Sequence, residues 1–265
     1  MLWFVRGERL MLRENPVKKK IKEGKLTLGS YCNPQRPFLI ELMAEAGYDF
    51  VVLDTEHGPY FGVEQCVDGV KTALAMNITP FIRVSHNNPI LIEKALGIGA
   101  CGVWVPHVDS GEECRQAVKA AKFPLQGERR GGVAPKDWEY ANEQTIVAVL
   151  PLESRKAIEN IEDTLSVPGV DLVSLSTGDI TFALGHPGQP MHPEVVSVRD
   201  RVLQLCQKKG LVAYAVGSPE LLQYYHQKGV RVFMSEANIR KAFQDHVKEI
   251  HKILLKIFQK IFLEE

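Results

Sequence analysis

The feature that most restricts the fold of this chain is a series of short apolar runs, rich in β-branched residues, that alternate with segments of helical character. This alternation is typical of repeated β/α units with parallel strands. Most of the runs are continuously apolar, as expected for strands that are covered on both faces. Eight runs occur, and they span residues 26–32, 50–53, 79–84, 102–105, 146–152, 172–175, 211–216 and 231–234.

Helices are expected between these runs, and a glycine marks the end of several of them. The segments AEAGYDF, KKGLVAY and QKGVRVF each place a glycine where a left-handed residue can end a helix before the next strand. Eight β/α units predict the α/β class and a single (β/α)₈ TIM barrel. The expected helices span residues 38–47, 62–76, 90–99, 111–122, 154–167, 193–209, 219–228, and 239 onward.

An open, doubly wound sheet is the alternative topology. It favours a glycine-rich turn between the first strand and its helix, where a pyrophosphate can meet a helix N-terminus. No such turn follows the first apolar run, and the GxGxxG match at 97–102 lies where a helix ends and a strand begins. The closed barrel is therefore the predicted topology.

The length of 265 residues suits one barrel domain. We expect residues 1–25 to form an N-terminal extension with a helix over the barrel floor, and residues 26–265 to form the barrel domain. The apolar stretch 250–263 near the C-terminus is interrupted by lysines and a glutamine at helical spacing. It is expected to be an amphipathic helix that belongs to the barrel domain.

Composition argues against several classes of partner and location. Lysine plus arginine equals aspartate plus glutamate at 32 each, so no excess of positive charge favours nucleic acid. No apolar run is long enough to span a membrane, and the first residues are too soon interrupted by charge for a secretory signal. The five cysteines contain no CxxC pair, which is typical of a reducing compartment. These features predict a cytoplasmic location.

Polar residues gather where the apolar runs end, and active sites of such barrels lie at the carboxyl ends of the strands. The second run is followed by LDTEHGP, and the sixth by STGDITFALGHPG. Residues from neighbouring strands would converge there into one site. The candidates are Asp54, Glu56 and His57 after the second run, Arg83 in the third, Glu153 after the fifth, and Gly178 and Asp179 after the sixth.

Glu153 and Asp179 are candidates for a shared metal site, because two carboxylates with open positions suit a hard divalent ion such as Mg²⁺ or Mn²⁺. The alternative for Glu153 is a negative charge that stabilises the start of the following helix. His57 beside Asp54 has the pattern of a general base and its orienting carboxylate. The alternative for this pair is a loop cap and an exposed histidine.

Arg83 lies inside an apolar strand, where an arginine is costly unless it meets an anion. It could bind a substrate carboxylate bidentately, and the backbone N–H groups at Gly178 and Asp179 could meet the same anion. The alternative is a structural ion pair with a neighbouring strand. Together these groups suit enolate chemistry on pyruvate. No lysine closely follows any of the apolar runs, so a Schiff-base route is disfavoured.

The blocks LDTEHGP, FIRVSHNNPILIEKALGIGACGVWVP, FPLQGERRGG, LPLESRKAIENI and STGDITFALGHPGQPMHPEV carry a resemblance to a known family. The chain resembles the HpcH/HpaI aldolases, the class II, metal-dependent pyruvate aldolases of the phosphoenolpyruvate/pyruvate barrel superfamily. The resemblance covers residues 28–243. It implies an aldehyde-lyase that acts on pyruvate and an aldehyde.

The resemblance also implies roles for single residues. Glu153 and Asp179 would bind the divalent metal, which is Mg²⁺, Mn²⁺ or Co²⁺, and Arg83 would contact pyruvate and its enolate. His57 falls on the acid/base histidine and Asp54 on the aspartate that orients it. The backbone of Gly178 and Asp179 would meet the pyruvate carboxylate. The family further implies a homo-oligomer, commonly a hexamer or trimer of dimers that exchange their last barrel helix.

Two positions depart from the family pattern. Pro151 stands where many members have a glutamine two residues before the metal glutamate, and Gly97 stands where many have an aspartate. We expect Gly97 to remove one carboxylate partner of His57, and Pro151 to remove a hydrogen bond near the substrate. The metal residues and Arg83 are retained.

Three functions are compatible with these residues. The first is an aldolase that cleaves or forms 4-hydroxy-2-oxo acids, such as 2-keto-3-deoxy sugar acids or compounds of the 2,4-dihydroxyhept-2-enedioate type. The second is a CoA-ester lyase of the same superfamily, with Arg129, Arg130 and Lys136 as a basic rim for the CoA phosphates. The third is a degenerate barrel that kept the fold and lost turnover, which Pro151 and Gly97 would explain.

Overall fold

The computed structural model describes residues 4–5, 8–9, 12–33, 36–57, 62–175, 178–235, 244 and 247–253. The chain divides by internal contacts into two units, Met1–Ser235 and Glu236–Glu265. Within the second unit, the backbone of residues 247–253 is helical. The remainder of the expected last helix lies outside the described residues, so its place in the barrel domain and its exchange between subunits stay predictions.

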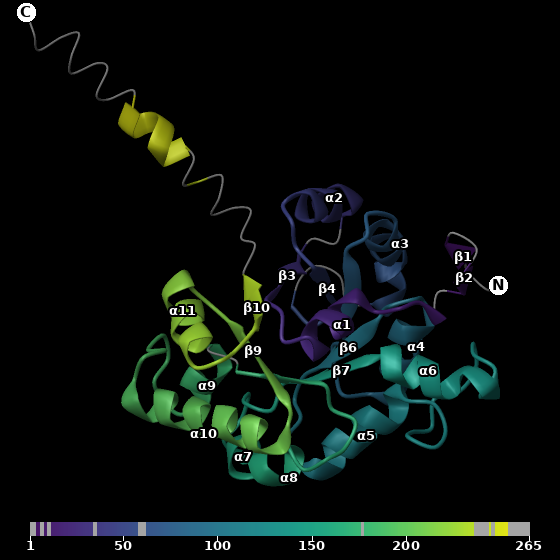
Figure 1. Cartoon of the computed structure of the whole chain (residues 1–265). Coiled ribbons are helices and arrows are strands. Elements are labelled where there is room, and N and C mark those ends of the chain that lie inside the picture. The colour runs from purple at the N-terminus through teal and green to yellow at the C-terminus, as the bar shows by residue number, and fades with distance from the viewer. Residues whose placement is uncertain are drawn as a thin grey trace, which may run out of the picture. The chain divides into compact units, whose positions relative to one another are not determined.

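The first unit contains a closed barrel of parallel strands in the order β10-β3-β4-β5-β6-β7-β8-β9 (Figure 1). Each strand pairs in parallel with the next one along the chain, and β10 closes the ring against β3. This confirms the predicted TIM barrel. The strands are β3 Thr27–Cys32, β4 Phe50–Asp54, β5 Thr79–Arg83, β6 Gly102–Val105, β7 Ile146–Val149, β8 Leu172–Ser174, β9 Val212–Val216 and β10 Val232–Ser235.

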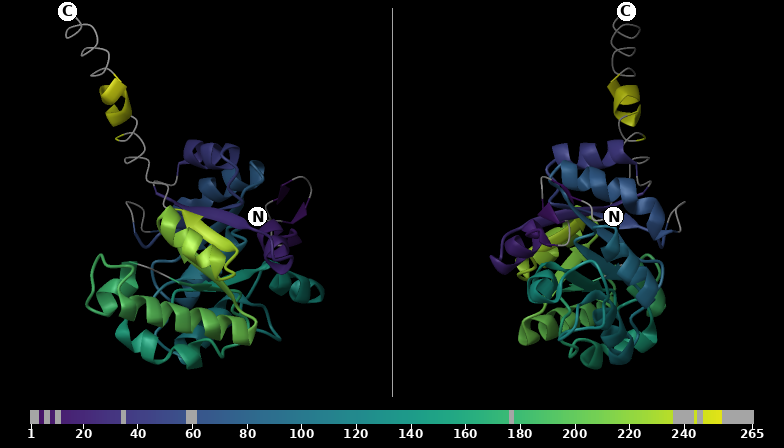
Figure 2. Two further views of the ribbon diagram at one scale, coloured as in Figure 1. Left: turned by 60° about the vertical axis from the view of Figure 1, so that its left-hand side comes forward. Right: turned by 90° about the vertical axis from the view of Figure 1, so that its right-hand side faces the viewer.

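Helices follow the strands and surround the barrel in both views of Figure 2. They begin mostly at proline or after a side-chain cap, as Asn88 caps its helix by accepting from the amides of Ile90 and Leu91. The elements on this outer layer are α2 Pro37–Glu45, η2 Val63–Cys66, α3 Val67–Ala75, α4 Pro89–Gly97, α5 Gly111–Ala121, α7 Arg155–Glu159, α8 Ile161–Thr164, α10 Pro193–Lys209 and α11 Pro219–Gln227.

Several described elements were not expected from the sequence. The predicted helix over 154–167 is divided at Asn160 into α7 and α8, and the Asn160 amide donates to the carbonyl of Asp109 at 3.0 Å. The additional short elements are the hairpin of β1 Phe4–Val5 and β2 Glu8–Arg9, η3 Pro135–Asp137, α6 Trp138–Gln144 and α9 Gly178–Ala183.

The N-terminal extension contains α1, Pro16–Lys22, which closes the floor of the barrel. Asn15 caps this helix by accepting from the amides of Val17 and Lys18 at 3.1 and 3.2 Å. Val17 is 1% exposed and packs with the residues of the barrel interior. A helix in the expected segment therefore seals the end of the barrel opposite to the carboxyl ends of the strands.

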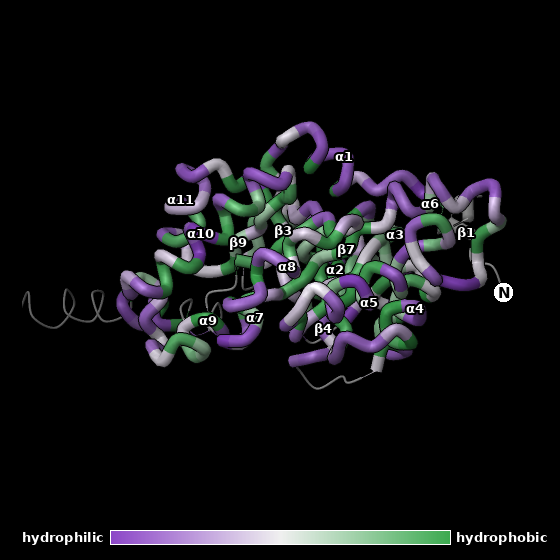
Figure 3. The backbone as a smooth tube through the Cα atoms, turned by 90° about the horizontal axis from the view of Figure 1, so that it is seen from below, coloured by the Kyte–Doolittle hydropathy of each residue, from purple (hydrophilic) through white to green (hydrophobic). Residues whose placement is uncertain are grey.

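The core has two layers that follow the alternation of side chains along each strand. In β4, Phe50 and Val52 point into the barrel, whereas Val51 and Leu53 belong to the cluster shared with the helices. Phe81 and Trp104 stack inside the barrel with ring centroids 4.6 Å apart. The hydropathy of the chain follows this arrangement, with apolar strands inside and polar helix surfaces outside (Figure 3). Because packed side chains fill the barrel interior, the residues available for chemistry lie at the strand ends.

Candidate active site

Asp54 and Arg83 form the centre of the candidate site, at the carboxyl ends of β4 and β5. Their backbones are paired partners in the parallel ladder. Arg83 Nε donates to Asp54 Oδ1 at 2.8 Å, and Arg83 Nη2 donates to Asp54 Oδ2 at 2.6 Å. The two residues are 8% and 1% exposed. A buried, bidentate ion pair of this kind fixes both side chains at the barrel mouth, which is the end of the barrel where the carboxyl ends of the strands lie.

Both members of this pair stay charged. Burial alone would raise the pKa of Asp54, but its hydrogen bonds and the charge of Arg83 outweigh burial and leave this pKa lowered. Burial alone would lower the pKa of Arg83, yet Asp54, Tyr31 and Glu56 leave it raised. The guanidinium also lies 4.4 Å from the centroid of the Tyr31 ring. Arg83 thus has the structural ion pair that the sequence left open as an alternative.

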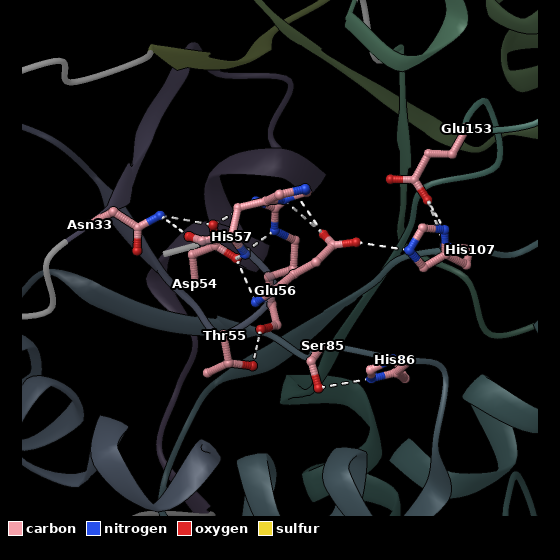
Figure 4. Close-up of polar contacts among 10 residues, drawn as sticks. Asn33, Asp54, Thr55, Glu56, His57, Ser85, His86, His107 and Glu153 are labelled. Atoms are coloured by element: carbon pink, nitrogen blue, oxygen red, sulfur yellow. Dashed lines mark hydrogen bonds and ion pairs between the residues drawn. The ribbon is translucent and has the colours of Figure 1, made fainter. Parts of the chain in front are cut away.

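Glu56 links Arg83 to two histidines. Its Oε2 lies 3.0 Å from Arg83 Nη1 and 3.4 Å from Nδ1 of His57. Its Oε1 lies 3.0 Å from Nε2 of His107 (Figure 4). The Glu56 side chain is only 8% exposed, whereas the side chains of His57 and His107 are 69% and 61% exposed. A buried carboxylate therefore orients two imidazoles that solvent and ligands can reach.

His57 meets Asp54 in a way that differs from the expectation. Its backbone N–H donates to Asp54 Oδ1 at 3.3 Å, and its imidazole faces Glu56. Asp54 also accepts from the amide of Glu56 and from the side chain of Asn33 at 2.9 Å (Figure 4). In this structure Asp54 accepts hydrogen bonds from the backbone of its own loop and from the side chain of Arg83. Glu56 is the carboxylate that faces the imidazole of His57.

Glu153 lies after β7, with its side chain 7% exposed. Its Oε2 accepts the backbone N–H of His107 at 2.5 Å and lies 3.4 Å from His107 Nδ1. Burial, together with the negative charges of Glu56 and Asp179, raises the pKa of Glu153 to about 8 against the opposing effects of the His107 amide and Arg83. The structure therefore gathers several carboxylates around a carboxyl group that is hard to ionise without a nearby cation.

Asp179 and Gly178 are the first residues of the short helix α9, and both are exposed. Asp179 is close enough for its charge to act on Glu153. The two predicted metal residues thus follow neighbouring strands, β7 and β8. The contact of the backbone N–H groups of Gly178 and Asp179 with a substrate carboxylate stays a prediction.

The donor set at the mouth fits a divalent cation. Carboxylate oxygens from Glu153 and Asp179 are ligands that Mg²⁺, Mn²⁺ and Co²⁺ accept. Asp54, Glu56 and His57 also place ligand atoms within 4.8 Å of one another. Asp54 is, however, already held by both branches of Arg83. The assignment of the cation to Glu153 and Asp179 stays a prediction.

Two residues of this site were not assigned a role from the sequence. Glu56 is a candidate only by its place in the loop after the second run, and the sequence assigns no role to His107. His107 has a backbone φ of 54°, which aims its N–H at Glu153. A left-handed histidine carries no signal in a single sequence, although its place directly after the fourth strand could have indicated the mouth.

Two expectations about more distant residues require correction. Gly97 ends α4, which leads into the start of β6, so within one subunit it lies at the barrel end opposite to His57 and cannot contact it. Arg129 was expected at a basic rim near the substrate. It is 4% exposed and lies over Phe123, beside residues that precede β6 and β7 at the barrel floor. Pro151, by contrast, follows β7 on the side of Glu153.

Comparison with known proteins identifies the family. The model of the HpcH/HpaI aldolase/citrate lyase family matches residues 27–233, which contain the barrel up to the first half of β10 and all of the mouth residues described above. The chain belongs to this family. The resemblance that the sequence blocks carried is thereby confirmed.

Relatives within this family are named as aldolases. A pyruvate aldolase from Rhizobium etli is 35% identical over 192 residues, which are 69% of this chain and 75% of that protein. A 2-dehydro-3,6-dideoxy-6-sulfogluconate aldolase from Pseudomonas putida is 29% identical and covers 82% of this chain and 92% of its own length. A 4-hydroxy-2-oxo-heptane-1,7-dioate aldolase from Escherichia coli is 29% identical, with 82% and 86% covered.

Solved structures of the family share the fold. An HpcH/HpaI aldolase from Desulfitobacterium hafniense superposes with a TM-score of 0.82 at 26% identity, over 89% of this chain and 96% of that chain. The citrate synthase SbnG superposes with a TM-score of 0.83 at 27% identity, over 91% and 98%. Among the described helices of this HpcH/HpaI family member, none has the length and apolar character needed to cross a membrane.

Proposed function

We propose that this chain is a divalent-metal-dependent aldolase that cleaves or forms 4-hydroxy-2-oxo acids through the enolate of pyruvate. The observation that carries the proposal is the buried carboxyl group of Glu153, on whose pKa the charges of Asp179 and Arg83 both act. The named activities of the aldolase relatives support the same reaction class. A cytoplasmic location and a homo-oligomer, as a hexamer or trimer of dimers, remain part of the proposal.

Glu153 and Asp179 would hold the divalent cation, which is Mg²⁺, Mn²⁺ or Co²⁺. A bound cation would polarise the 2-oxo group of the substrate and stabilise the negative charge that develops when the carbon–carbon bond breaks. The raised pKa of Glu153 fits this role, because a buried carboxylate surrounded by like charges gains most from a cation beside it.

The protein's own groups would bind and orient the acid. Arg83 keeps further N–H donors beyond those bound to Asp54, so its guanidinium can contact the pyruvate carboxylate or enolate. The backbone N–H groups of Gly178 and Asp179 offer additional donors to the carboxylate. Asp54 is the positioning residue for Arg83, since its two oxygens fix the plane of the guanidinium.

A histidine at the mouth would carry out the proton transfers. In the cleavage direction a base removes the proton from the 4-hydroxyl group, the bond between C3 and C4 breaks, and its electron pair forms the enolate. The aldehyde then leaves and C3 takes a proton to give pyruvate. His57 is exposed and held by Glu56, so it can exchange protons with substrate and solvent.

The alternative functions find less support in the structure. The basic rim of a CoA-ester lyase would consist of Arg129, Arg130 and Lys136. Arg130 and Lys136 are exposed, but Arg129 is buried at the floor, away from the mouth. A degenerate barrel was suggested by Gly97 and Pro151. Gly97 makes no contact with His57 within one subunit, and the residues of the proposed metal site are all present.

The proposal is tested by incubating the purified full chain with Mg²⁺ or Mn²⁺ and a panel of 4-hydroxy-2-oxo acids while pyruvate release is followed. The wild-type protein should release pyruvate, and a chelator should abolish the release. The Glu153→Gln variant should lose at least 100-fold in kcat/KM, about 2.7 kcal/mol. Glu162→Gln, on the exposed surface of α8, is the matched control and should retain activity. Pyruvate release without metal, or undiminished in Glu153→Gln, would contradict the proposal.

A further inference from the structure

The loop between α9 and α10 and the first turn of α10 contain a group of side chains that the proposed reaction does not use. One nitrogen of His186, one nitrogen of His192 and one carboxylate oxygen of Glu194 all lie within 4.8 Å of one another. Among the described residues, the other group with this spacing is that of Asp54, Glu56 and His57 at the mouth. The two groups share no residue. We call His186, His192 and Glu194 the histidine cluster.

The backbone of the loop brings the two histidines together. The carbonyl of His186 accepts the N–H of Gln189 at 3.1 Å, and the carbonyl of Gln189 accepts the N–H of His192 at 3.0 Å. Gly185 and Gly188 have backbone φ angles of 81° and 73°, in the left-handed region that favours glycine. The loop is thus folded into successive turns, and the two imidazole rings stack with centroids 3.4 Å apart and planes inclined by 20°.

The loop is also fixed to α10. His192 lies at the N-cap of this helix, where its carbonyl accepts the N–H of Val196 at 2.9 Å. Further along the helix, Arg199 is 0% exposed, and its Nη2 donates to the carbonyl of Pro190 in the loop. A set of ligands on a loop that is held in this way needs little reorganisation to bind an ion.

Glu194 faces the histidines as the anionic member of the cluster. Its Oε2 lies 2.8 Å from Nε2 of His186, and the two side chains are 49% and 24% exposed. Ligand atoms around a tetrahedral Zn²⁺ are about 3.3 Å apart, given metal–ligand distances of about 2.0–2.2 Å. Small rotations of the exposed Glu194 side chain would therefore admit an ion between these two atoms.

A helix cap and an ion pair account for only part of this arrangement. Serine, threonine, aspartate and asparagine are the preferred N-cap residues, whereas here the cap is a histidine. The hydrogen bond from the Glu194 amide to His192 Nδ1 is long, at 3.3 Å, so a cation can compete for this lone pair. The charge of Arg155 also acts on Glu194, so neutralising this carboxylate does not require two imidazoles.

The ligand types in the cluster differ from those proposed for the mouth. Two imidazoles and one carboxylate, with water as the fourth ligand, are a set that Zn²⁺ uses in proteins. Imidazole suits Zn²⁺, Cu²⁺ and Ni²⁺, whereas Mg²⁺ and Mn²⁺ prefer oxygen ligands. The histidine cluster should therefore select a transition-metal ion over the Mg²⁺ that carboxylates would accept.

We propose that the histidine cluster is a second metal site, in which His186, His192 and Glu194 bind one Zn²⁺ or a similar transition-metal ion. The ion would hold the loop after α9 against the first turn of α10. This role is structural and does not depend on the reaction proposed for the mouth, because none of the three ligands belongs to the mouth.

Zinc binding is measured by isothermal titration of the full chain in a buffer that does not bind metals. The wild-type protein should bind Zn²⁺ at the cluster, and His186→Gln and His192→Asn should each weaken that binding by at least roughly 100-fold. This estimate follows because loss of a residue that only supports a metal ligand already weakens binding about 10- to 100-fold. His226→Gln, at an exposed position of α11, is the matched control and should bind as the wild type does.

Thermal unfolding separates a metal site from a helix cap. Asparagine is a preferred N-cap residue, so His192→Asn should unfold without metal at the same or a higher temperature than the wild type. Zn²⁺ should raise the unfolding temperature of the wild type and of His226→Gln, because it binds the folded state. The increase should be smaller in His192→Asn.

The variant Glu153→Gln distinguishes this site from the mouth. The component of Zn²⁺ binding that His192→Asn loses should persist in Glu153→Gln, and Mg²⁺ should bind equally to the wild type and to His192→Asn. No Zn²⁺ binding by the wild type, or equal Zn²⁺ binding by the wild type and His192→Asn, would overturn the proposal. Zn²⁺ binding that is lost in Glu153→Gln and kept in His192→Asn would place the ion at the mouth and would also overturn it.

Discussion

At the scale of single residues, the mouth depends on how buried charges are paired. Asp54 and Arg83 neutralise each other in a nearly solvent-free environment, so each is needed for the other to be tolerated. Glu153 is the opposite case, since its nearest described charges include two further carboxylates. Substitutions in the Asp54–Arg83 pair should therefore strongly affect stability, and the contribution of Glu153 to stability should depend on pH and metal.

Asp54→Asn should destabilise the protein by roughly 3 kcal/mol, because it removes the bidentate carboxylate from the buried guanidinium of Arg83 and leaves it with the single ion pair to Glu56. The free energy of unfolding in urea measures this loss. Glu112→Gln, which breaks the exposed pair with Arg115, is the control and should cost at most about 0.5 kcal/mol. Equal effects of the two substitutions would contradict the account of the pair.

Metal-free protein should become less stable as pH rises from about 4.5 to about 8. Burial first, then Glu56 and Asp179, raise the folded pKa of Glu153 to about 8, above its ordinary value. The native state therefore holds a proton that the unfolded state has lost, and this contribution to stability disappears as pH passes the folded pKa. Thermal unfolding in a chelator should show Glu153→Gln gaining on the wild type across this range. A pH-independent difference would be the contrary result.

The sequence made Asp54, His57, Arg83, Glu153 and Asp179 candidates because each lies near or after the end of an apolar run, and parallel strands bring such positions to one end of a barrel. It did not assign the link from Glu56 to His107, because that contact depends on the path of a loop with a left-handed residue. Contacts between loops depend on backbone angles that composition and periodicity do not encode.

At the scale of elements, the barrel depends on close backbone approach between neighbouring strands. A Cβ atom at Gly102 would lie 2.3 Å from the carbonyl oxygen of Ile146, at the start of the β6–β7 pair. A Cβ atom at Gly97, at the end of α4, would lie in open space. Close backbone packing therefore explains the glycine at position 102 but not the glycine at position 97.

Gly102→Ala should destabilise the protein by roughly 2 kcal/mol, since the strands must separate to admit the methyl group. Gly97→Ala should leave stability unchanged or raise it by about 0.5 kcal/mol, because alanine is the better helix former. Denaturant unfolding of the two variants under one set of conditions decides between them. A tolerated alanine at Gly102 would show that the approach of these strands is not required.

The strands and outer helices were predictable because apolar runs and helix boundaries are local signals. The break of the expected helix at Asn160 was not, since the side chain that accompanies it bonds to Asp109 in a different loop. Nor was α6 expected, because residues 138–144 have no clear apolar period. Elements of this kind depend on tertiary contacts more than on local pattern.

At the scale of the whole molecule, the closed barrel separates two chemically different ends. The mouth gathers carboxylates around Arg83, whereas the lysines of α1 at the floor each pair with a carboxylate. A chain with equal numbers of acidic and basic residues can therefore contain a local excess of acidic groups. Net charge argued against nucleic acid as a partner, but it contained no information about this local separation.

The central claim is that Glu153 and Asp179 hold one divalent ion where pyruvate can form its enolate. The most direct measurement is the exchange of pyruvate methyl protons with D₂O, followed by proton NMR in the presence of Mg²⁺. The account predicts exchange by the wild-type protein that stops on chelation and falls at least 100-fold in Glu153→Gln and Asp179→Asn. Exchange that persists in these variants or without metal would contradict it.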